Sequence, residues 1–161
     1  AHRKAFCERK VREGIAGGAI QVLLLGAGYE TLGWRLAPEF PDVTFFEIDH
    51  PATAQLKAKG ITAMGDRGNL ELIAADLGVH GLGDVLSTNG KWDPDALSVI
   101  VAEGLLMYLP ETAVEALLEQ CAGVCAAGSR LVFTYVGTLA NGRPDAGPRT
   151  GWILWLLEAS G

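Results

Sequence analysis

The amino-acid sequence predicts an α/β fold, in which a mostly parallel sheet is covered by helices on both faces. Short apolar runs alternate with stretches of helical pattern, as in repeated βαβ units. The run QVLLLGAGYET at Gln21–Thr31 leads from apolar residues into a Gly-Ala-Gly turn. The run FFEID at Phe45–Asp49 ends in a carboxylate 21 residues after the second glycine. A glycine turn followed by an acid at this distance is typical of a nucleoside-cofactor site.

The first half of the chain predicts three helices and two strands. Arg3–Ala16 is amphipathic and ends at a pair of glycines, which favours a helix stop. The continuous apolar run Val22–Leu25 is typical of a buried parallel strand. Thr31–Ala37 predicts a helix that ends before a proline, and Val43–Ile48 predicts the second strand. Pro51–Lys59 predicts a helix whose first turn accommodates its proline.

The second half predicts three further strands and two further helices. Leu70–Ala74 and Leu97–Ala102 are short apolar runs, each followed by an acid within two residues. Pro110–Val124 predicts a helix, because a proline stands at its start and apolar residues recur on one face. Ser129–Val136 predicts a fifth strand, and Gly151–Ser160 predicts a final helix.

Length and composition predict one globular domain. The chain has 161 residues, of which 49% are hydrophobic. The stretch Thr138–Thr150, rich in Gly and Pro, predicts a mobile loop and not a domain boundary. The net charge of −6 argues against a nucleic-acid partner, and no apolar run reaches membrane-spanning length. Three cysteines without paired spacing, and a start without the apolar core of a signal peptide, predict a cytoplasmic location.

The turn after the first predicted strand indicates which cofactor it serves. A dinucleotide fingerprint has a third glycine three residues after the second, and Thr31 stands at that position. Glu30 also places a negative charge where a pyrophosphate would lie. S-adenosylmethionine carries an adenosine without phosphates, a cationic sulfonium and a zwitterionic tail, so it avoids that repulsion. We therefore expect S-adenosylmethionine as the cofactor, and a nicotinamide-dependent oxidoreductase is the alternative from another enzyme class.

Candidate site residues follow the carboxyl ends of the predicted strands: Gly26, Gly28, Asp49, Asp76 and Glu103. Three of them have an alternative reading. Glu47 points to the same face of its strand as Asp49 and is a second candidate for the acid that binds the ribose. Asp76 is equally suited to a turn, and Glu103 alternatively forms a structural ion pair with Arg35. No spacing predicts a metal site, because Cys121 and Cys125 lack further ligands nearby in the sequence.

Three blocks of the sequence resemble the leucine carboxyl methyltransferase family, which includes many bacterial S-adenosylmethionine-dependent methyltransferases. They are GAGYETLGWRL at Gly26–Leu36, FFEIDHP at Phe45–Pro51 and EGLLMYLP at Glu103–Pro110, and the last is the most specific. The resemblance runs from about Arg3 to the predicted final helix. It implies a Rossmann-like class I methyltransferase fold with a seven-stranded sheet.

The resemblance also implies roles for individual residues. Gly26 and Gly28 would face the methionine and ribose part of the cofactor, and Asp49 would hold the ribose hydroxyls. Asp76 and Leu77 would flank the adenine, and Glu103 would lie near the amino-acid end. Arg3 matches the family arginine that pairs with the cofactor's carboxylate. The implied cofactor-binding set is Arg3, Gly26, Ala27, Gly28, Asp49, Asp76, Leu77 and Glu103.

The chain departs from the family pattern at two places. Bacterial members often have Asp-Thr-Arg after the glycines, whereas this chain has Glu30, Thr31 and Leu32, so a charge that could contact a substrate is absent. The chain also lacks a starting methionine and stops at Gly161, after five predicted strands. We therefore expect residues 1–161 to be a single cofactor-binding domain that is incomplete at both ends, with a sheet edge left uncovered.

The predicted function is S-adenosylmethionine-dependent O-methylation. The expected acceptor is a carboxylate or hydroxyl of a small molecule or of a protein C-terminus. No residue stands out as a general base, so no catalytic residue is assigned, although Met107 and Tyr108 are candidates to line the methyl-transfer pocket. A catalytically silent interaction module is a third possibility. The sequence predicts neither the acceptor's identity nor the oligomeric state.

Overall fold

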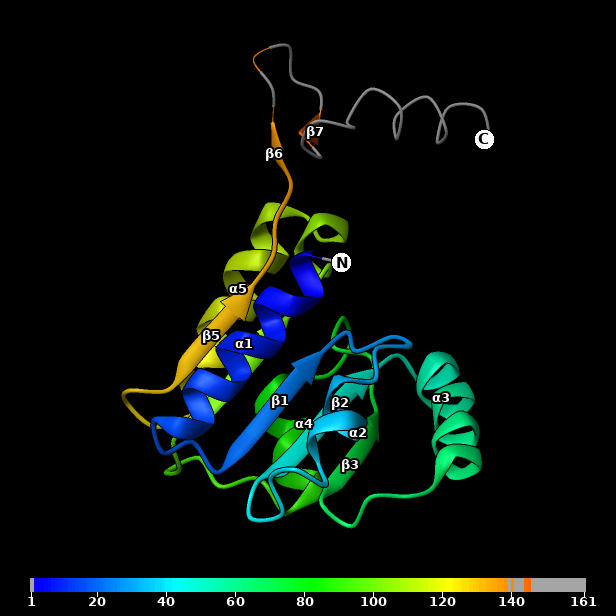
Figure 1. Cartoon of the computed structure of the whole chain (residues 1–161). Helices are drawn as coiled ribbons and strands as arrows, with labels where there is room; N and C mark the ends of the chain where they lie inside the picture. The colour runs from blue at the N-terminus through cyan, green and yellow to red at the C-terminus, as the bar shows by residue number, and fades with distance from the viewer. Residues whose placement is uncertain (1, 139, 141–143, 146–161) are drawn as a thin grey trace.

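A five-stranded, fully parallel sheet forms the centre of the molecule (Figure 1). The structure is a computed structural model that describes residues 2–138, 140 and 144–145. The strands are β1 (Gln21–Leu25), β2 (Thr44–Asp49), β3 (Leu70–Ala74), β4 (Ser98–Ala102) and β5 (Arg130–Phe133), in the spatial order β3-β2-β1-β4-β5. The predicted parallel α/β architecture is therefore confirmed, with all five strands within about two residues of their predicted starts.

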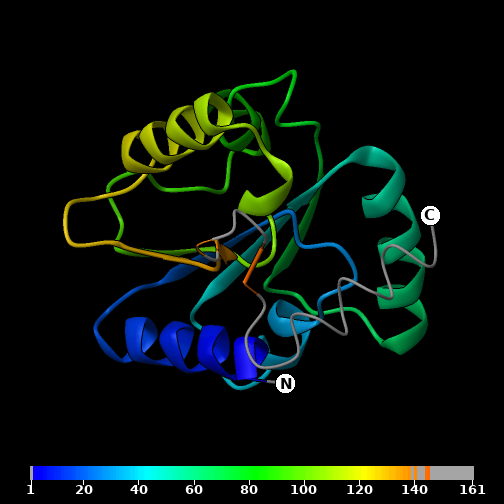
Figure 2. The ribbon, with the colours of Figure 1, turned by 90° about the horizontal axis from the view of Figure 1, so that it is seen from above.

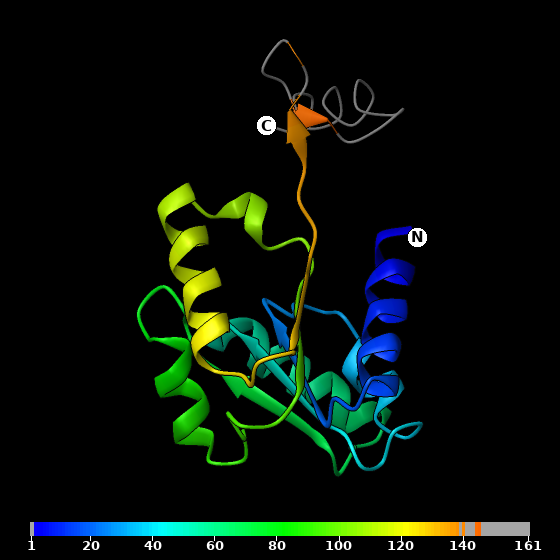
Figure 3. The same cartoon turned by 90° about the vertical axis from the view of Figure 1, so that its left-hand side faces the viewer.

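The described part of the chain also contains five α-helices and one short 3₁₀ segment, of which all but α1 lie between strands. They are α1 (His2–Ala16), α2 (Leu32–Leu36), α3 (Pro51–Met64), α4 (Leu82–Asn89), η1 (Leu106–Tyr108) and α5 (Glu111–Gly123). Figure 3 shows the sheet between α1 on one side and α4 and α5 on the other, and Figure 2 shows the same layers from above.

Two apolar cores result, one on each face of the sheet. Cys7 and Val11 of α1 pack with Leu32 and Leu36 of α2 against alternate residues of the strands, such as Val22. On the opposite face, residues of α4 and α5 pack against the other alternate residues. Each central strand is buried on both faces, which explains why β1 and β4 are continuous apolar runs in the sequence.

Two helices differ from the sequence prediction. Helix α3 continues to Met64 instead of ending at Lys59, because Gly60 faces open space and buried Ile61 anchors the following turn. Helix α4 was not predicted, since its eight residues lie between Gly81 and Gly90. Leu82 and Leu86 of α4 are buried in the core beside α5.

The C-terminal part of the chain also differs from expectation. The fifth strand ends at Phe133 instead of Val136, and β6 (Gly137–Thr138) pairs antiparallel with β7 (Pro144–Asp145) inside the expected loop. The expected helix at Gly151–Ser160 lies outside the described residues. Among those residues, β5 has a single neighbouring strand, β4, and its side chains Leu131 and Phe133 are exposed.

The strand order fixes where a ligand can bind. The chain builds β1, β2 and β3 outward in one direction and then returns to place β4 beside β1. The connections after β1 and β4 therefore leave the sheet in opposite directions and open a crevice at the carboxyl ends of these strands. This is the switch point at which the candidate residues of the sequence were expected to meet.

Candidate functional site

A cavity of about 430 Å³ lies at the carboxyl ends of β1, β2 and β3. Its polar wall contains Asp49, His50 and Asp76, which follow β2 and β3. Its apolar wall comes from the segment after β4 and from α5, and contains Leu105, Leu109, Ala113 and Leu117. This volume falls in the range of small-molecule sites, which are mostly apolar with a few polar groups that orient the ligand.

A second cavity, of about 200 Å³, also borders the glycine turn, and its wall contains acidic and basic side chains among apolar ones. Arg3 and Lys4 reach it from the first turn of α1, Glu30 from the loop before α2, and Glu103 from the end of β4. Gly26 lines both cavities. One elongated ligand could therefore place an apolar and hydroxylated part in the larger cavity and a charged part in the smaller one.

The glycine turn borders both cavities and carries almost no side chains. Gly26 has a φ of +59°, and a Cβ placed on it would lie 2.9 Å from Cδ1 of Leu105. Gly28 has a φ of +49°. Both conformations favour glycine. The buried Ala27 between them donates its N–H to the carbonyl of Ile48 at 3.3 Å, which ties the turn to the end of β2.

Asp49 lines the larger cavity and also holds the glycine turn. Its Oδ2 accepts a hydrogen bond from the N–H of Gly28 at 2.5 Å, and its Oδ1 accepts one from the N–H of His50 at 2.7 Å. A carboxylate has about four acceptor positions, so both oxygens can still accept hydrogen bonds from a ligand. Of the two acids considered on β2, Asp49 is the one that faces the cavity.

Glu47, the alternative acid, is buried away from both cavities. Its carboxylate lies 2.5 Å from Nζ of Lys57 in α3, and both side chains are almost fully buried. Burial raises the pKa of Glu47, and the charge of Lys57 opposes that shift. Gly33 of α2 packs directly over it, since a Cβ there would lie 2.6 Å from Oε1 of Glu47. Glu47 therefore belongs to the packing between α2, α3 and the sheet.

Asp76 closes a turn and also lines the larger cavity. Its Oδ1 accepts a hydrogen bond from the N–H of Gly78 at 2.8 Å, which closes a turn, and its side chain also lines the larger cavity beside Leu77. Its Oδ2 lies 4.0 Å from Nε2 of His50. His50 itself caps α3, because its Nδ1 accepts a hydrogen bond from the N–H of Ala52 at 3.3 Å.

Arg3 and Glu103 meet in the smaller cavity. Nε of Arg3 lies 2.9 Å from Oε1 of Glu103, a half-exposed cation over a carboxylate that is only 12% exposed. The considered pairing of Glu103 with Arg35 is wrong, since Arg35 pairs with Glu8 at 2.7 Å. Beneath this pair, Cys7 is fully buried, and burial together with the charge of Glu103 raises the pKa of its thiol to about 11.

Several wall residues were missed by the sequence reading. The residues of the apolar wall, Leu105, Leu109, Ala113 and Leu117, are spaced by four, but the first two precede α5, so this spacing does not mark one helix face. Lys4 and Gln120 carried no signal either. Met107 and Tyr108 were expected to line the site, but both are exposed and neither lines the two cavities. Leu32, where the family often has an arginine that could contact a substrate, is buried in α2 and lines the smaller cavity.

Two features are absent from the described residues, namely a cluster of metal-ligating side chains and a helix long and apolar enough to span a membrane. Among residues 2–138, 140 and 144–145, no group of three or more His, Cys, Asp or Glu side chains is placed to hold a metal ion. Within the same ranges, no helix has the length and apolar character needed to cross a membrane.

The fold and the cavities place the chain in the class of Rossmann-like methyltransferase folds. A putative methyltransferase from Thermobifida fusca superposes with a TM-score of 0.67 at 20% identity, covering 98% of this chain and 58% of that one. A putative O-methyltransferase from Nostoc punctiforme gives a TM-score of 0.65 at 13% identity, covering 91% of this chain and 40% of that one. At these identities the likeness concerns the fold.

The chain belongs to the leucine carboxyl methyltransferase family, whose sequence profile matches residues 1–122. A putative S-adenosyl-L-methionine-dependent methyltransferase from Streptomyces avermitilis is 35% identical over 161 residues, covering 97% of this chain. Relatives of the same description from Mycobacterium sp. strains KMS and MCS are 34% identical over 159 residues. The chain spans 56% of the length of each of these three relatives. The family resemblance found in the sequence is thus confirmed.

Proposed function

We propose that this chain is the cofactor-binding domain of an S-adenosylmethionine-dependent O-methyltransferase. The observation that carries the proposal is the pair of cavities on either side of Gly26. One is apolar with two acids at its rim, which suits an adenosine, and the other contains two cations and two anions, which suits the zwitterionic end of an amino acid. The names of the sequence relatives support the same cofactor.

The side chains present fit S-adenosylmethionine part by part. Asp49 would accept hydrogen bonds from the ribose hydroxyls, and Asp76 with Leu77 would flank the adenine against the α5 wall. Gly26, Ala27 and Gly28 would let the ligand pass close to the backbone, since a side chain at Gly26 would block the passage. Arg3 would face the carboxylate of the tail, and Glu103 its ammonium group.

The chemistry divides between cofactor and protein. When bound, S-adenosylmethionine supplies an electrophilic methyl group on a sulfonium. The protein holds the tail through Arg3 and Glu103 and the ribose through Asp49, and so orients the reacting end toward the acceptor. Such alignment is worth up to roughly 7–11 kcal/mol of the barrier in the best intramolecular cases. A carboxylate acceptor is already a nucleophile, whereas a hydroxyl acceptor needs its proton removed.

The smaller cavity argues against a nicotinamide dinucleotide. A pyrophosphate that crosses the glycine turn would compete with the carboxylates of Glu30 and Glu103 for Lys4 and Arg3, the cations with which they already pair. The third-glycine position holds Thr31, directly before a helix of only five residues. Anionic phosphates are favoured at helix N-termini without such acids.

Calorimetry of the full-length protein that contains this chain tests the proposal. We expect S-adenosylhomocysteine to bind and NADH not to bind. Heat from NADH alone would favour the oxidoreductase, and the absence of heat and of any thermal shift with S-adenosylhomocysteine would refute the proposed cofactor.

The type of acceptor is tested by the stability of the product. Incubation with methyl-labelled S-adenosylmethionine and a metabolite extract should give a labelled product. A methyl ester releases labelled methanol in alkali, whereas a methyl ether keeps its label. The family's leucine carboxyl description supports the ester. A protein that binds the cofactor but labels nothing would instead be a silent interaction module.

A further inference from the structure

The smaller cavity contains a second ion pair besides Arg3 and Glu103. Nζ of Lys4, which follows Arg3 on the first turn of α1, pairs with Oε2 of Glu30. The two carboxylates are mostly buried, at 16% exposure for Glu30 and 12% for Glu103, whereas the two cations are more than half exposed. Two mostly buried carboxylates are therefore each paired with a more exposed cation, and both cations come from a single helical turn.

Glu30 is fixed at both of its oxygens. Besides the contact of Oε2 with Lys4, Oε1 accepts a hydrogen bond from the N–H of Thr31 at 2.9 Å and lies 3.9 Å from Arg35. Burial acts to raise the pKa of Glu30, but the contacts with Lys4, Thr31 and Arg35 together lower it. The carboxylate thus stays ionised at the edge of the glycine turn.

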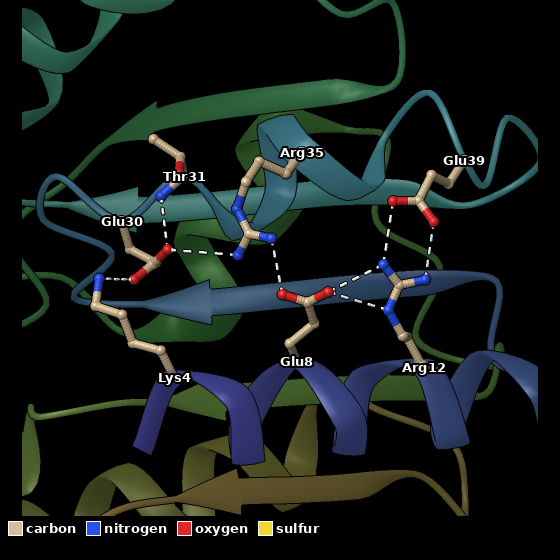
Figure 4. A network of polar contacts seen from close by, with 7 residues as sticks. All are labelled: Lys4, Glu8, Arg12, Glu30, Thr31, Arg35 and Glu39. Carbon is tan, nitrogen blue, oxygen red and sulfur yellow. Dashed lines mark hydrogen bonds and ion pairs between the residues drawn. The ribbon is translucent and has the colours of Figure 1, made fainter. Parts of the chain in front are cut away.

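An alternating chain of charges extends from this pair along α1 (Figure 4). Arg35 pairs with Glu8 at 2.7 Å, and Glu8 pairs with Arg12 at 2.9 Å. Arg12 in turn holds both oxygens of Glu39, at 2.9 and 3.1 Å. Figure 4 shows that these side chains bridge α1 and the segment from Glu30 to Glu39. The chain of charges therefore fastens α1 to the segment 30–39, which contains α2.

We propose that the Lys4–Glu30 pair determines specificity for the amino-acid end of an adenosine ligand, and that Arg35, Glu8 and Arg12 position this pair. The inference rests on the proposed function. A zwitterion needs an anion near its ammonium group and a cation near its carboxylate, and the cavity presents two of each. An adenosine ligand without that tail would occupy the larger cavity alone and would not contact the pair.

The position of Lys4 explains why the Lys4–Glu30 pair should also affect the Arg3–Glu103 pair. Arg3 and Lys4 both lie on the first described turn of α1. Lys4 is adjacent to Arg3 on this turn, and the guanidinium of Arg3 lies against Gly104. When Glu30 holds Lys4, the same turn keeps Arg3 over Glu103.

The test compares two ligands that differ only at the tail. S-adenosylhomocysteine has the amino-acid end, and 5′-methylthioadenosine has the same adenosine and sulfur without it. In the full-length protein, we expect Glu30→Gln to weaken S-adenosylhomocysteine about tenfold while methylthioadenosine changes less than about twofold. Glu8→Gln, outside both cavities, should give a smaller loss of about threefold for S-adenosylhomocysteine alone.

Glu13→Gln is the matched control. Glu13 lies on the same helix and pairs with Lys10 and Arg9, but it is not linked to the chain of charges. This variant should leave both affinities unchanged. A parallel loss of both ligands in Glu30→Gln, or an equal effect of Glu13→Gln and Glu8→Gln, would overturn the proposal.

A double-variant cycle tests whether Lys4 and Glu30 act together. If they do, the double variant that carries both Lys4→Met and Glu30→Gln should bind S-adenosylhomocysteine with an affinity no lower than that of the single variant that binds it less tightly. Additive losses would contradict a joint role. If Glu30→Gln does not fold, selective loss in both Lys4→Met and Glu8→Gln supports the inference, and its absence overturns it. Failure of the wild type to bind either ligand would instead refute the proposed cofactor site.

Discussion

Asp49 shows how one carboxylate can serve both the fold and the candidate site. Its two oxygens hold the N–H groups of Gly28 and His50, so the acid fixes the glycine turn before any ligand arrives. Asp49 also lines the larger cavity. A ligand that approaches the ribose position therefore meets an acceptor whose orientation is already set, which reduces the ordering that binding requires.

Asp49→Asn should weaken S-adenosylhomocysteine by about tenfold or more, because hydrogen bonds to a charged group contribute roughly 1.5–3 kcal/mol. The loss is measured by calorimetry of the full-length protein. Asp42→Asn, at an exposed turn before β2, is the control and should bind as the wild type does. An unchanged affinity in Asp49→Asn would remove this residue from the proposed site.

The buried pair of Glu47 and Lys57 gives a second prediction for single residues. Lys57→Met leaves a buried carboxylate without its cation, which should cost about 3–5 kcal/mol of unfolding free energy at neutral pH. Glu47→Leu combined with Lys57→Met should restore most of it, because neither charge remains. Urea unfolding of the variants measures both effects, and a fully stable Lys57→Met protein would contradict them.

The stability cost of Lys57→Met should depend on pH in a definite direction. Burial raises the pKa of Glu47 above its ordinary value of 4.5, so the folded chain binds more protons than the unfolded chain between the two values. The contribution of Glu47 to the free energy of unfolding is therefore fully present below pH 4.5. It is lost as the pH rises from 4.5 through the raised pKa of Glu47 in the folded chain. Removal of Lys57 should therefore cost less at pH 5 than at pH 8. A cost that grows as the pH falls would show that Glu47 is not the titrating group.

At the scale of elements, helices α3 and α4 provide a matched pair of glycines. A Cβ on Gly60, inside α3, and a Cβ on Gly90, at the end of α4, would both meet open space. Only Gly90 has a positive φ, of +72°. Gly60→Ala should therefore raise stability by about 0.5–1 kcal/mol, and Gly90→Ala should lower it by about 1 kcal/mol. Thermal unfolding measures both, and the same sign for the two would contradict the backbone assignment.

The sequence predicted the strands well and the helices less well. The central strands β1 and β4 are buried at every residue, so their apolar runs are a local signal, whereas the edge strands β3 and β5 are only partly buried. Helix α4 has no comparable signal, because its start is stabilised from a distance. The N–H of Leu82 donates to Oε1 of Gln120 at 2.7 Å, across 38 residues. The predicted end of α3 at Lys59 is wrong, because Ile61 beyond it is buried and the helix continues to Met64.

The residues of the candidate site also fall into those that the sequence could predict and those that it could not. Gly26, Asp49, Asp76 and Glu103 were predictable, because the carboxyl ends of parallel strands must meet at one edge. Lys4, Gln120 and the α5 wall were not, because they reach the cavities from helices whose rotation about their axes depends on packing. The sequence also suggested Met107 and Tyr108, but the 3₁₀ turn η1 leaves these side chains exposed.

At the scale of the whole molecule, the two cavities predict where a ligand should protect the backbone. S-adenosylhomocysteine should slow amide hydrogen exchange in the turn 26–31, in the turn 76–78 and in the first turn of α1, because all three border the cavities. Residues 62–65, at the other end of α3, should exchange unchanged. Exchange measured by mass spectrometry tests this pattern. Protection confined to the turn 76–78 would show that the smaller cavity takes no part.

The strand order also bears on when the site can form during folding. Gln21 of β1 bonds to Ser98 of β4, 77 residues later, and Arg3 pairs with Glu103, 100 residues later. The wall of the larger cavity extends further, to Gln120. Contacts so distant in sequence form late and slow the search for the native state. A growing chain therefore cannot use a ligand as a template for its first strands. The ligand can bind only after β4 has joined the sheet, and its effect is then to slow unfolding.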